Sequence, residues 1–470
     1  MKKVCLLCWI FIPILADIQA QSVIEKLKTA VGALEKDSQL RHGIVSFYVT
    51  DAKTGKPLFE KNAQMGLAPA STQKLITSVT AFELLGSDFR YKTRLGYNGI
   101  IENGVLKGDF FIIGSADPTL GSWRFAETNE ENVLENILHT LQQNNIRRIN
   151  GSIYTEESGF SIQSVPDGWI WQDIGNYYGA GSWGFNWREN QYDLILKPGA
   201  KIGDTTKIIS PIGEGNGFFL TNTITTGKKG SGDNAYIYLA PYSLFGFTTG
   251  TIPMGGGFTI SGSMPNPPMQ FGNQLKNILS RSNITVDKDF KFYINKLSNN
   301  MEWAYPKSIL DSILSPPLDS INYWFLKKSI NLYGEALIKT LARQKSGFGS
   351  TEKGVQVIKD FWNQRGIELS AINIVDGSGL SPQNRITTHT LVKVLQYAKT
   401  SSWFQSFYGA LPVYNGMKIK SGSIGGARSF AGYHVSKTGK EYIFAIIVNN
   451  YNGSSGDIVK KMYRVLDVLK

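Results

Sequence analysis

The apolar and polar positions of the chain change in spacing from segment to segment, and this change predicts its secondary structure. Outside the middle of the chain, the predicted helices are Val23–Leu34, Ser71–Leu85, Leu332–Arg343, Glu352–Arg365 and Thr388–Thr400. Runs of β-branched and aromatic residues predict strands at Ile44–Thr50, Asn415–Lys420, Ser429–His434 and Tyr442–Asn449. Strands near both ends with helices between them predict an α+β fold, with one sheet assembled from both termini.

The segment 89–300 has a different texture and predicts an insertion. It is rich in Gly, Thr, Ile, Tyr and Asn, with short strand-like runs such as Tyr236–Leu239 and Phe258–Ser261 and one helical stretch, Asn132–Gln143. We therefore expect a mostly β insertion, of one or two subdomains, between the two parts of a discontinuous domain formed by residues 21–88 and 301–470.

The first 20 residues have the pattern of a secretory signal peptide. Lys2 and Lys3 form a short basic start, an apolar run follows, and Ala20 is a small residue at the expected cleavage point. Both cysteines of the chain, Cys5 and Cys8, lie inside this leader, so we expect a mature protein without disulfides or thiolate metal sites. The sequence predicts secretion across the inner membrane to the periplasm, and no later stretch has the length of an apolar transmembrane helix.

The chain is basic, with a formal net charge of +12 at pH 7. A basic surface favours anionic partners such as cell-wall polymer, nucleic acid or lipid head groups. Export argues against nucleic acid. Because the sequence contains no long run of Lys or Arg, we expect the charge to be spread over a solvated surface.

Ser71 and Lys74 stand three residues apart at the start of a predicted helix. This spacing places a hydroxyl and an amine on one face of the helix, one turn apart. A serine nucleophile needs that geometry if an amine takes its proton, and a helix start favours a developing anion. The spacing alone is a weak signal, because the second copy, Ser350 to Lys353, reads as an ordinary helix cap.

In enzymes whose nucleophilic serine is activated by a lysine, two further motifs occur with the serine. One has a serine hydroxyl and an asparagine amide two residues apart, and the other is a strand with a lysine. Ser329-Ile330-Asn331 fits the first, and Lys420-Ser421-Gly422-Ser423 fits the second. The literal Lys-Thr-Gly triplets at 53–55 and 437–439 adjoin predicted strands and read as hairpin turns with solvated lysines. Glycines near Lys420 let a ligand approach the strand edge, so we expect the site there.

The motifs in this order, over nearly the whole mature chain, resemble the class C low-molecular-mass penicillin-binding proteins, which are D-alanyl-D-alanine carboxypeptidases and endopeptidases. The matching segments are Ala70–Lys74, Gly114–Leu120, Lys328–Glu335, Asp376–Ser381, Lys420–Ser423 and Ala431–Tyr433. Two residues depart from the family pattern: Ile330 replaces an acid, and Ser421 replaces a threonine while keeping a hydroxyl. The resemblance implies a penicillin-binding serine transpeptidase-like domain, an antiparallel sheet with helices, that carries the insertion.

The resemblance also implies the substrate and the inhibitors. The substrates would be peptidoglycan stem peptides, and β-lactams would act as covalent inhibitors, with no metal or organic cofactor. The backbone N–H groups of Ser71 and Ser423 would form the oxyanion hole. The oligomeric state stays open.

Residue chemistry suggests a role for each candidate. Ser71 would attack the carbonyl between two D-alanines, and Lys74 would act as base if burial and the nearby Lys420 lower its pKa. Ser329 could relay the proton to the leaving amine, and Asn331 could hold the substrate amide. Lys420 would attract the terminal carboxylate of the substrate, with Ser421 and Ser423 as hydrogen-bond donors. Asp173, an acid among aromatic residues, is a candidate to meet the side-chain amine of a stem peptide.

Other chemistries fit the residues less well. The chain has four scattered histidines and no G-x-S-x-G or H-E-x-x-H motif, which argues against a Ser-His-Asp hydrolase and a zinc peptidase. A non-catalytic cell-wall-binding or penicillin-sensing relative is the alternative function. A β-lactamase is a third option, but the sequence offers no recognisable deacylating acid. The aromatic cluster from Trp169 to Trp187 fits core packing better than sugar binding.

Overall fold

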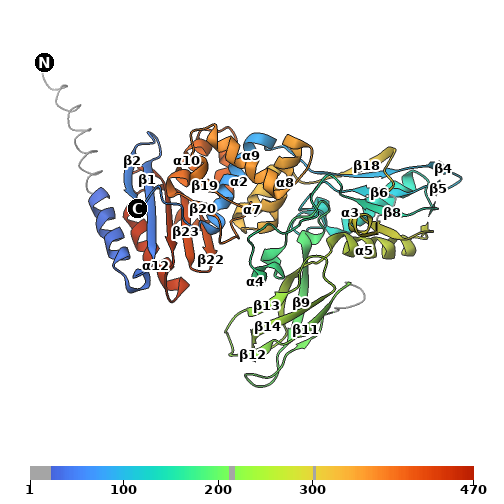
Figure 1. Ribbon diagram of the computed structural model, residues 1–470, viewed down its shortest axis with the longest axis horizontal. Helices are drawn as coiled ribbons and strands as arrows, with labels where there is room; N and C mark the ends of the chain where they lie inside the picture. Colours follow the sequence, from blue (N-terminus) through green and yellow to red (C-terminus); the bar gives the residue numbers. More distant parts are fainter. Residues whose placement is uncertain (1–22, 211–216, 300–302) are drawn as a thin grey trace, which may run out of the picture.

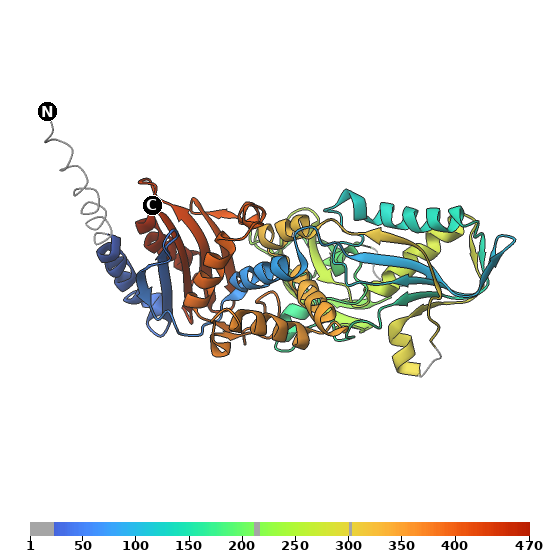
Figure 2. The ribbon, with the colours of Figure 1, turned by 90° about the horizontal axis from the view of Figure 1, so that it is seen from above.

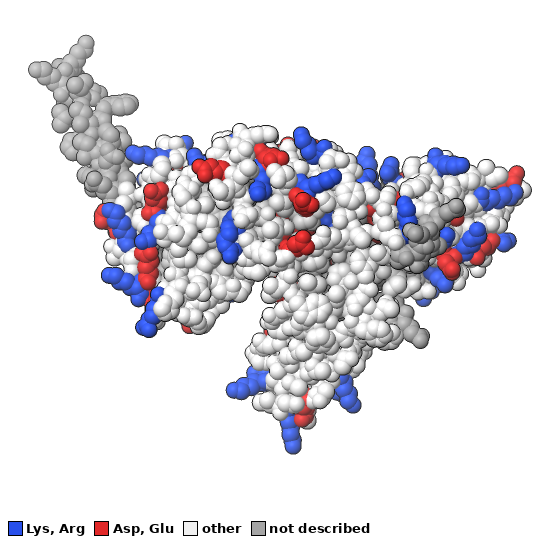
Figure 3. Space-filling view, viewed as in Figure 1, with Lys and Arg blue, Asp and Glu red and all other residues white. Residues whose placement is uncertain are grey.

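The computed structural model describes residues 23–210, 217–299 and 303–470. The expected signal peptide and its two cysteines lie outside the described residues. No helix in the described part of the chain is both long enough and apolar enough for a membrane span. On the face shown in Figure 3, basic and acidic side chains are interspersed.

A six-stranded antiparallel sheet forms the centre of one end of the molecule, and both termini contribute to it (Figure 1). Its order is β2-β1-β24-β23-β22-β21. The strands are β1 Ile44–Asp51, β2 Pro57–Lys61, β21 Val413–Tyr414, β22 Met417–Ile424, β23 Ala427–Val435 and β24 Glu441–Asn449. Val45 in β1 lies opposite Val448 in β24, so the prediction of one sheet built from both ends is confirmed.

The alternation of side chains along β24 places apolar residues on both faces of this sheet. Ile443, Ala445 and Ile447 belong to one core, while Phe444 and Ile446 belong to another. The first core is covered by α2 Lys74–Leu85, α7 Leu318–Lys327, α8 Asn331–Ser346, α9 Thr351–Asn363, α10 Thr388–Lys399 and α11 Phe404–Ala410. The second is covered by a helix over residues 23–35 and by α12 Ser455–Leu466. The sheet therefore lies between two helical layers (Figure 2).

The insertion forms two further lobes. The first has a five-stranded sheet, β17-β8-β6-β3-β18, and a four-stranded sheet, β16-β7-β5-β4, around one core with α3 Glu130–Gln143 and α5 Pro267–Arg281. Its strands are β3 Lys92–Tyr97, β4 Ile100–Glu102, β5 Val105–Lys107, β6 Phe110–Ile113, β7 Arg148–Ile149, β8 Ile153–Glu156, β16 Thr285–Val286, β17 Phe290–Phe292 and β18 Ser308–Leu314. Because β18 pairs with β3, this lobe continues beyond residue 300.

The second lobe is the one drawn below the rest of the molecule in Figure 1. It packs a three-stranded sheet, β10-β9-β15, against a four-stranded sheet in which β14 pairs with β11, β12 and β13. Its strands are β9 Gln191–Lys197, β10 Lys207–Ile208, β11 Phe219–Asn222, β12 Thr225–Gly227, β13 Asn234–Tyr238, β14 Phe245–Pro253 and β15 Phe258–Ser263. The remaining short elements are α4 Trp171–Ile174, α6 Tyr293–Asn299, β19 Ile372–Asn373 and β20 Arg385–Ile386.

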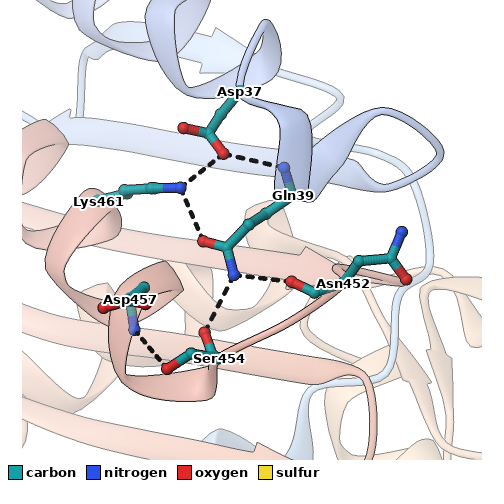
Figure 4. Close-up of polar contacts among 6 residues, drawn as sticks. All are labelled: Asp37, Gln39, Asn452, Ser454, Asp457 and Lys461. Carbon is teal, nitrogen blue, oxygen red and sulfur yellow. Dashed lines mark hydrogen bonds and ion pairs between the residues drawn. The ribbon is translucent and has the colours of Figure 1, made fainter.

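A small polar network joins the two ends of the chain on the side of the central sheet that the N-terminal helix and α12 cover (Figure 4). Lys461 of α12 donates to the carboxylate of Asp37 at 2.6 Å and to Gln39 Oε1 at 2.8 Å. Gln39 Nε2 donates to the backbone carbonyls of Asn452 and Ser454, at 2.7 and 3.1 Å. One glutamine thus ties the turn after the N-terminal helix to the start of α12.

We predict that Gln39→Ala lowers the free energy of unfolding by about 1–2 kcal/mol, because several hydrogen bonds between distant segments are lost. Urea unfolding followed by circular dichroism measures this change. Lys460→Ala is the matched control, since Lys460 pairs with Asp457 on the surface and its side chain is 73% exposed. We expect that variant to stay within about 0.5 kcal/mol of the parent. Equal urea midpoints for parent and Gln39→Ala would contradict the structural role of this network.

Candidate active site

Ser71 lies in a 3-10 turn, Ala70–Gln73, directly before α2, and Lys74 is the first residue of α2. The predicted helix 71–85 is therefore confirmed from Lys74 onward. Ala70 has φ of 48°, a left-handed value that a non-glycine residue seldom adopts. Such strain is held by surrounding packing and is typical of functional turns. Here Thr72 Oγ1 donates to Pro69 O at 2.7 Å and helps to hold the turn.

Strand β22 passes close to this turn at Gly422. A Cβ at position 422 would lie 2.5 Å from Pro69 O and 2.9 Å from Ser71 N, so only glycine fits. Ser429, opposite Gly422 on β23, donates to the same Pro69 carbonyl at 2.5 Å. Gly422 thus makes room for the turn that carries Ser71, rather than for a ligand.

The amine of Lys74 donates three hydrogen bonds and is fully buried. Its Nζ lies 2.9 Å from Ser71 Oγ, 2.6 Å from Asn331 Oδ1 and 2.7 Å from the Ser378 carbonyl. The amide oxygen and the carbonyl can only accept. When Lys74 is neutral, its two N–H bonds satisfy these two acceptors, and the lone pair of Nζ is left for the Ser71 hydroxyl.

Asn331 is held so that its oxygen faces Lys74. Its Nδ2 donates at 2.7 Å to the backbone carbonyl of Tyr178, which belongs to the insertion. This second bond fixes which end of the amide points at the lysine. Both polar groups of Asn331 therefore have partners inside the protein, and contact of this amide with a substrate stays a prediction.

The turn that presents the Ser378 carbonyl is organised by the buried carboxylate of Asp376. This carboxylate accepts from the backbone N–H groups of Gly379 and Ser381, at 2.8 and 2.7 Å. It also accepts from three side chains: Gln73 Nε2, Asn384 Nδ2 and Trp169 Nε1. The sequence indicates this segment only through the family resemblance, and its contact with Lys74 was not predicted, because a backbone carbonyl leaves no side-chain signature.

Burial lowers the pKa of Lys74 from its ordinary value to about 7, although the nearby carboxyl groups of Asp376 and Glu335 act in the opposite direction. Burial raises the pKa of Glu335 to about 8, with a further increase from Asp376. Its carboxyl accepts the Gly377 N–H at 3.1 Å, next to the carbonyl-presenting turn. Because a protonated Glu335 carries no charge, it adds little to the stability of a charged Lys74 at neutral pH.

Lys420 lies on β22 and bridges to the Ser329 loop. Its Nζ donates to Ser329 Oγ at 2.8 Å and to the Ser421 carbonyl at 2.7 Å. Burial, together with the charge of Lys74, holds the pKa of Lys420 well below its usual value. Ser329 has φ of 59°, a second strained position beside the site. Ile330, which replaces the acid of the family pattern, leaves the side chains of Ser329 and Asn331 in the site.

These groups open into a cleft of about 1000 Å³ between the domain of the central sheet and the insertion. The predicted residues that line this cleft are Ser71, Asp173, Ser329, Asn331, Ser421 and Ser423. Tyr178 Oη donates to Asp173 Oδ1 at 3.3 Å, and burial raises the pKa of Asp173. The site thus includes residues of the insertion as well as the motif residues around Ser71, Ser329 and Lys420.

The alternative motif copies lie elsewhere. Ser350 caps α9 by accepting the Lys353 N–H, as predicted. Lys53 and Lys437 occupy the turns of the β1–β2 and β23–β24 hairpins and are exposed, which confirms their assignment as turn lysines.

The aromatic residues between Trp169 and Trp187 differ in their exposure to solvent. Trp169, Trp183 and Trp187 are buried, whereas Trp171 and Tyr177 are about half exposed.

Comparison with known proteins adds independent findings. The model of the D-Ala-D-Ala carboxypeptidase 3 (S13) family matches residues 27–468. The chain is 24% identical over 470 residues to the D-alanyl-D-alanine carboxypeptidase of Actinomadura sp. (strain R39), with 94% of this chain and 84% of that protein covered.

Two solved structures show the same fold. Penicillin binding protein 4 (dacB) from Haemophilus influenzae has a TM-score of 0.79 at 20% identity, over 93% of this chain and 98% of that chain. The same protein complexed with a novel β-lactam has a TM-score of 0.73 at 19% identity, over 94% of this chain and 99% of that chain. The expected penicillin-binding α+β fold is therefore confirmed.

Proposed function

The chain belongs to the D-Ala-D-Ala carboxypeptidase 3 (S13) family and is a serine-type peptidase, and we propose that Ser71 is its nucleophile and Lys74 its base. The observation that carries this proposal is the position of the buried Lys74 amine between Ser71 Oγ and two acceptor-only groups. A lone pair directed at the serine, on an amine with a pKa of about 7, has the properties of a general base at neutral pH.

In the proposed reaction, Ser71 Oγ attacks the carbonyl carbon of a D-alanyl bond in a peptidoglycan stem peptide, and its proton moves to Lys74. The backbone N–H groups of Ser71 and Ser423 stabilise the oxyanion. The C–N bond then breaks: Ser329, hydrogen-bonded to Lys420, gives its hydroxyl proton to the leaving amine and takes up the proton that Lys74 accepted from Ser71, so that Lys74 is neutral again. Water hydrolyses the ester and frees Ser71. Cleavage of a terminal D-alanine is carboxypeptidase action, and cleavage of a crosslink is endopeptidase action.

Lys420 and its hydroxyl neighbours receive the substrate carboxylate in this scheme. A carboxylate at Ser421 and Ser423 would place a negative charge beside Lys420, whose pKa burial and Lys74 otherwise hold low. This charge favours the protonated form of Lys420. A positive Lys420 in turn favours the neutral form of Lys74, so carboxylate binding would help to prepare the base.

We also propose that residues 1–20 are removed as a signal peptide and that the enzyme works in the periplasm. The basic start, apolar run and small residue near Ala20 support this proposal. N-terminal sequencing of protein isolated from its cell of origin tests it: a mature chain that starts at Met1 would contradict removal of the leader.

The direct test of the nucleophile is intact-mass analysis after treatment with penicillin. We expect one added penicillin mass, on the peptide that contains Ser71, and none in Ser71→Ala protein. Ser350→Ala should label like the parent, because Ser350 is a helix cap. Within the same assay, Lys420→Ala should label far more slowly, whereas Lys437→Ala should not change. Labelling that persists in folded Ser71→Ala protein would reject Ser71 as the nucleophile.

The low pKa of Lys74 predicts a pH dependence for acylation. The protonated amine cannot accept the Ser71 proton, so the second-order rate constant for penicillin should rise from about pH 6 to about pH 8 and then level off. Lys74→Arg keeps its charge at all of these pH values and should acylate very slowly. Stopped-flow measurement with a fluorescent penicillin gives the profile. A rate constant that does not change over this range would argue against Lys74 as the base.

Asp173 is our candidate for recognition of a free side-chain amine on the stem peptide. It lines the cleft beside Tyr178 and the half-exposed Trp171. Asp173→Asn keeps the shape and removes the charge, so kcat/KM for a peptide with a free amine should fall roughly tenfold. The N-acetylated peptide and penicillin serve as controls and should react at the parent rate. If free and acetylated peptides respond alike to the substitution, Asp173 has a structural role.

A further inference from the structure

One face of the four-stranded sheet in the second insertion lobe carries aromatic side chains that do not belong to the hydrophobic core of the lobe. Strand partners lie on the same face, so the register places Phe219 with Phe245 and Tyr238 with Phe247. The opposite face packs inward, where Ile237 and Ile252 belong to the core of the lobe. We call the outward side the aromatic face and define it by its rings Phe219, Tyr236, Tyr238, Phe245 and Phe247.

Four of these rings contact one another in two pairs. Phe219 stacks on Phe245 with centroids 5.6 Å apart, and Tyr238 stacks on Phe247 with centroids 4.8 Å apart. Phe245 is 71% exposed and Phe219 50% exposed, values that are unusual for phenylalanine on a regular sheet. A contiguous exposed patch of this kind marks a binding surface.

The aromatic face is continuous with the catalytic cleft. Trp171 packs against Tyr238 at 5.7 Å and belongs to α4, whose next two residues line the cleft. Tyr236, two residues before Tyr238 on the same face of β13, lines the cleft directly. A ligand seated at Ser71 can therefore extend onto this face without leaving the protein surface.

The chemistry of the face selects the kind of ligand. Along β11, β13 and β14, the described side chains that share this face are aromatic rings, threonines, Asn234 and Pro253, and none of them is charged. In Figure 3 the lobe shows charged side chains only toward its far end. Such a surface suits a neutral chain of N-acetylated amino sugars, whose apolar C–H faces pack on rings and whose hydroxyl and amide groups meet Tyr, Thr and Asn.

We propose that the aromatic face binds the glycan chain to which the stem peptide is attached, so that the enzyme acts on peptides still linked to their polymer. The inference rests on the proposed function, because it takes the stem peptide at Ser71 as its starting point. From Phe245 to Thr251 the strand β14 spans about 20 Å, which provides room for several sugar rings. The insertion thereby supplies part of the substrate-binding surface.

The test compares two substrates in the full-length enzyme: a free stem pentapeptide and the same peptide carried on uncrosslinked glycan chains. We expect the parent to favour the glycan-linked peptide in kcat/KM by roughly tenfold, and Phe245→Ser/Phe247→Ser to lose that preference. Penicillin acylation and hydrolysis of the free peptide should stay at parent levels, which shows that the variant is folded. Phe348→Ser, which removes an exposed phenylalanine outside this face, is the matched control and should behave like the parent.

A binding measurement separates this inference from the proposed function. Insoluble chains of N-acetylglucosamine, which carry no charge, should sediment Ser71→Ala protein, and the same protein with Phe245→Ser/Phe247→Ser should remain in solution. Equal kcat/KM for both substrates in the parent, or an unchanged preference in the double variant, would overturn the glycan site. Loss of a dimer in sedimentation velocity, with glycan binding intact, would show instead that the face joins two copies of the chain. If the parent cleaves neither peptide and resists penicillin, the proposed function itself fails.

Discussion

The active site depends on the removal of one amine from water. Lys74 is buried at the start of α2, and its Nζ donates to two groups that can only accept hydrogen bonds. Each acceptor comes from a different part of the fold, Asn331 from α8 and the Ser378 carbonyl from a turn that Asp376 organises. The direction of the Lys74 lone pair is therefore set by packing between segments, and the reactivity of Ser71 follows from it.

A second constraint is the presence of two buried lysines beside one another. A charge on either Lys74 or Lys420 disfavours a charge on the other, and burial disfavours both. The carboxyl groups near Lys74 offset this only in part, since burial raises the pKa of Glu335 to about 8. A negative charge from outside the protein would therefore stabilise the charged form of a lysine in this site, and a substrate carboxylate supplies such a charge.

The sequence predicted the side chains of this site better than its architecture. The motif residues Ser71, Lys74, Ser329, Asn331 and Lys420 carry recognisable chemistry at recognisable spacing, and the structure brings them together. Their chemical roles remain proposals. The contacts from Ser378 and Tyr178 could not be foreseen, because both act through backbone carbonyls.

The fold was predicted in the same uneven way. Four strands of the central sheet (β1, β22, β23 and β24) and five helices that cover it (residues 23–35, α2, α8, α9 and α10) were predicted, because their apolar periods are strong. The short strands β2 and β21 and the helices α7, α11 and α12 were not predicted. The helix α5, which begins with two prolines and contains Gly272, was missed inside the insertion. The partner of β3 was missed too, since the pairing of β18 is a contact between residues more than 200 positions apart. Long-range pairing of this kind leaves no local pattern.

The construction of the central sheet from both ends has a consequence for when the enzyme becomes reactive. β1 is synthesised early, but it can form its full pairing only after β24 has been synthesised, because it pairs with β24 along its whole length. A chain synthesised from its N-terminus carries Ser71 and Lys74 long before Lys420 exists, and the hydrogen bond from Gln39 to Asn452 spans 413 positions. Closing such a large loop delays assembly of the sheet. The nucleophile, its base and the second lysine therefore meet only in a finished polypeptide, so an incomplete or truncated chain has no competent acylation centre.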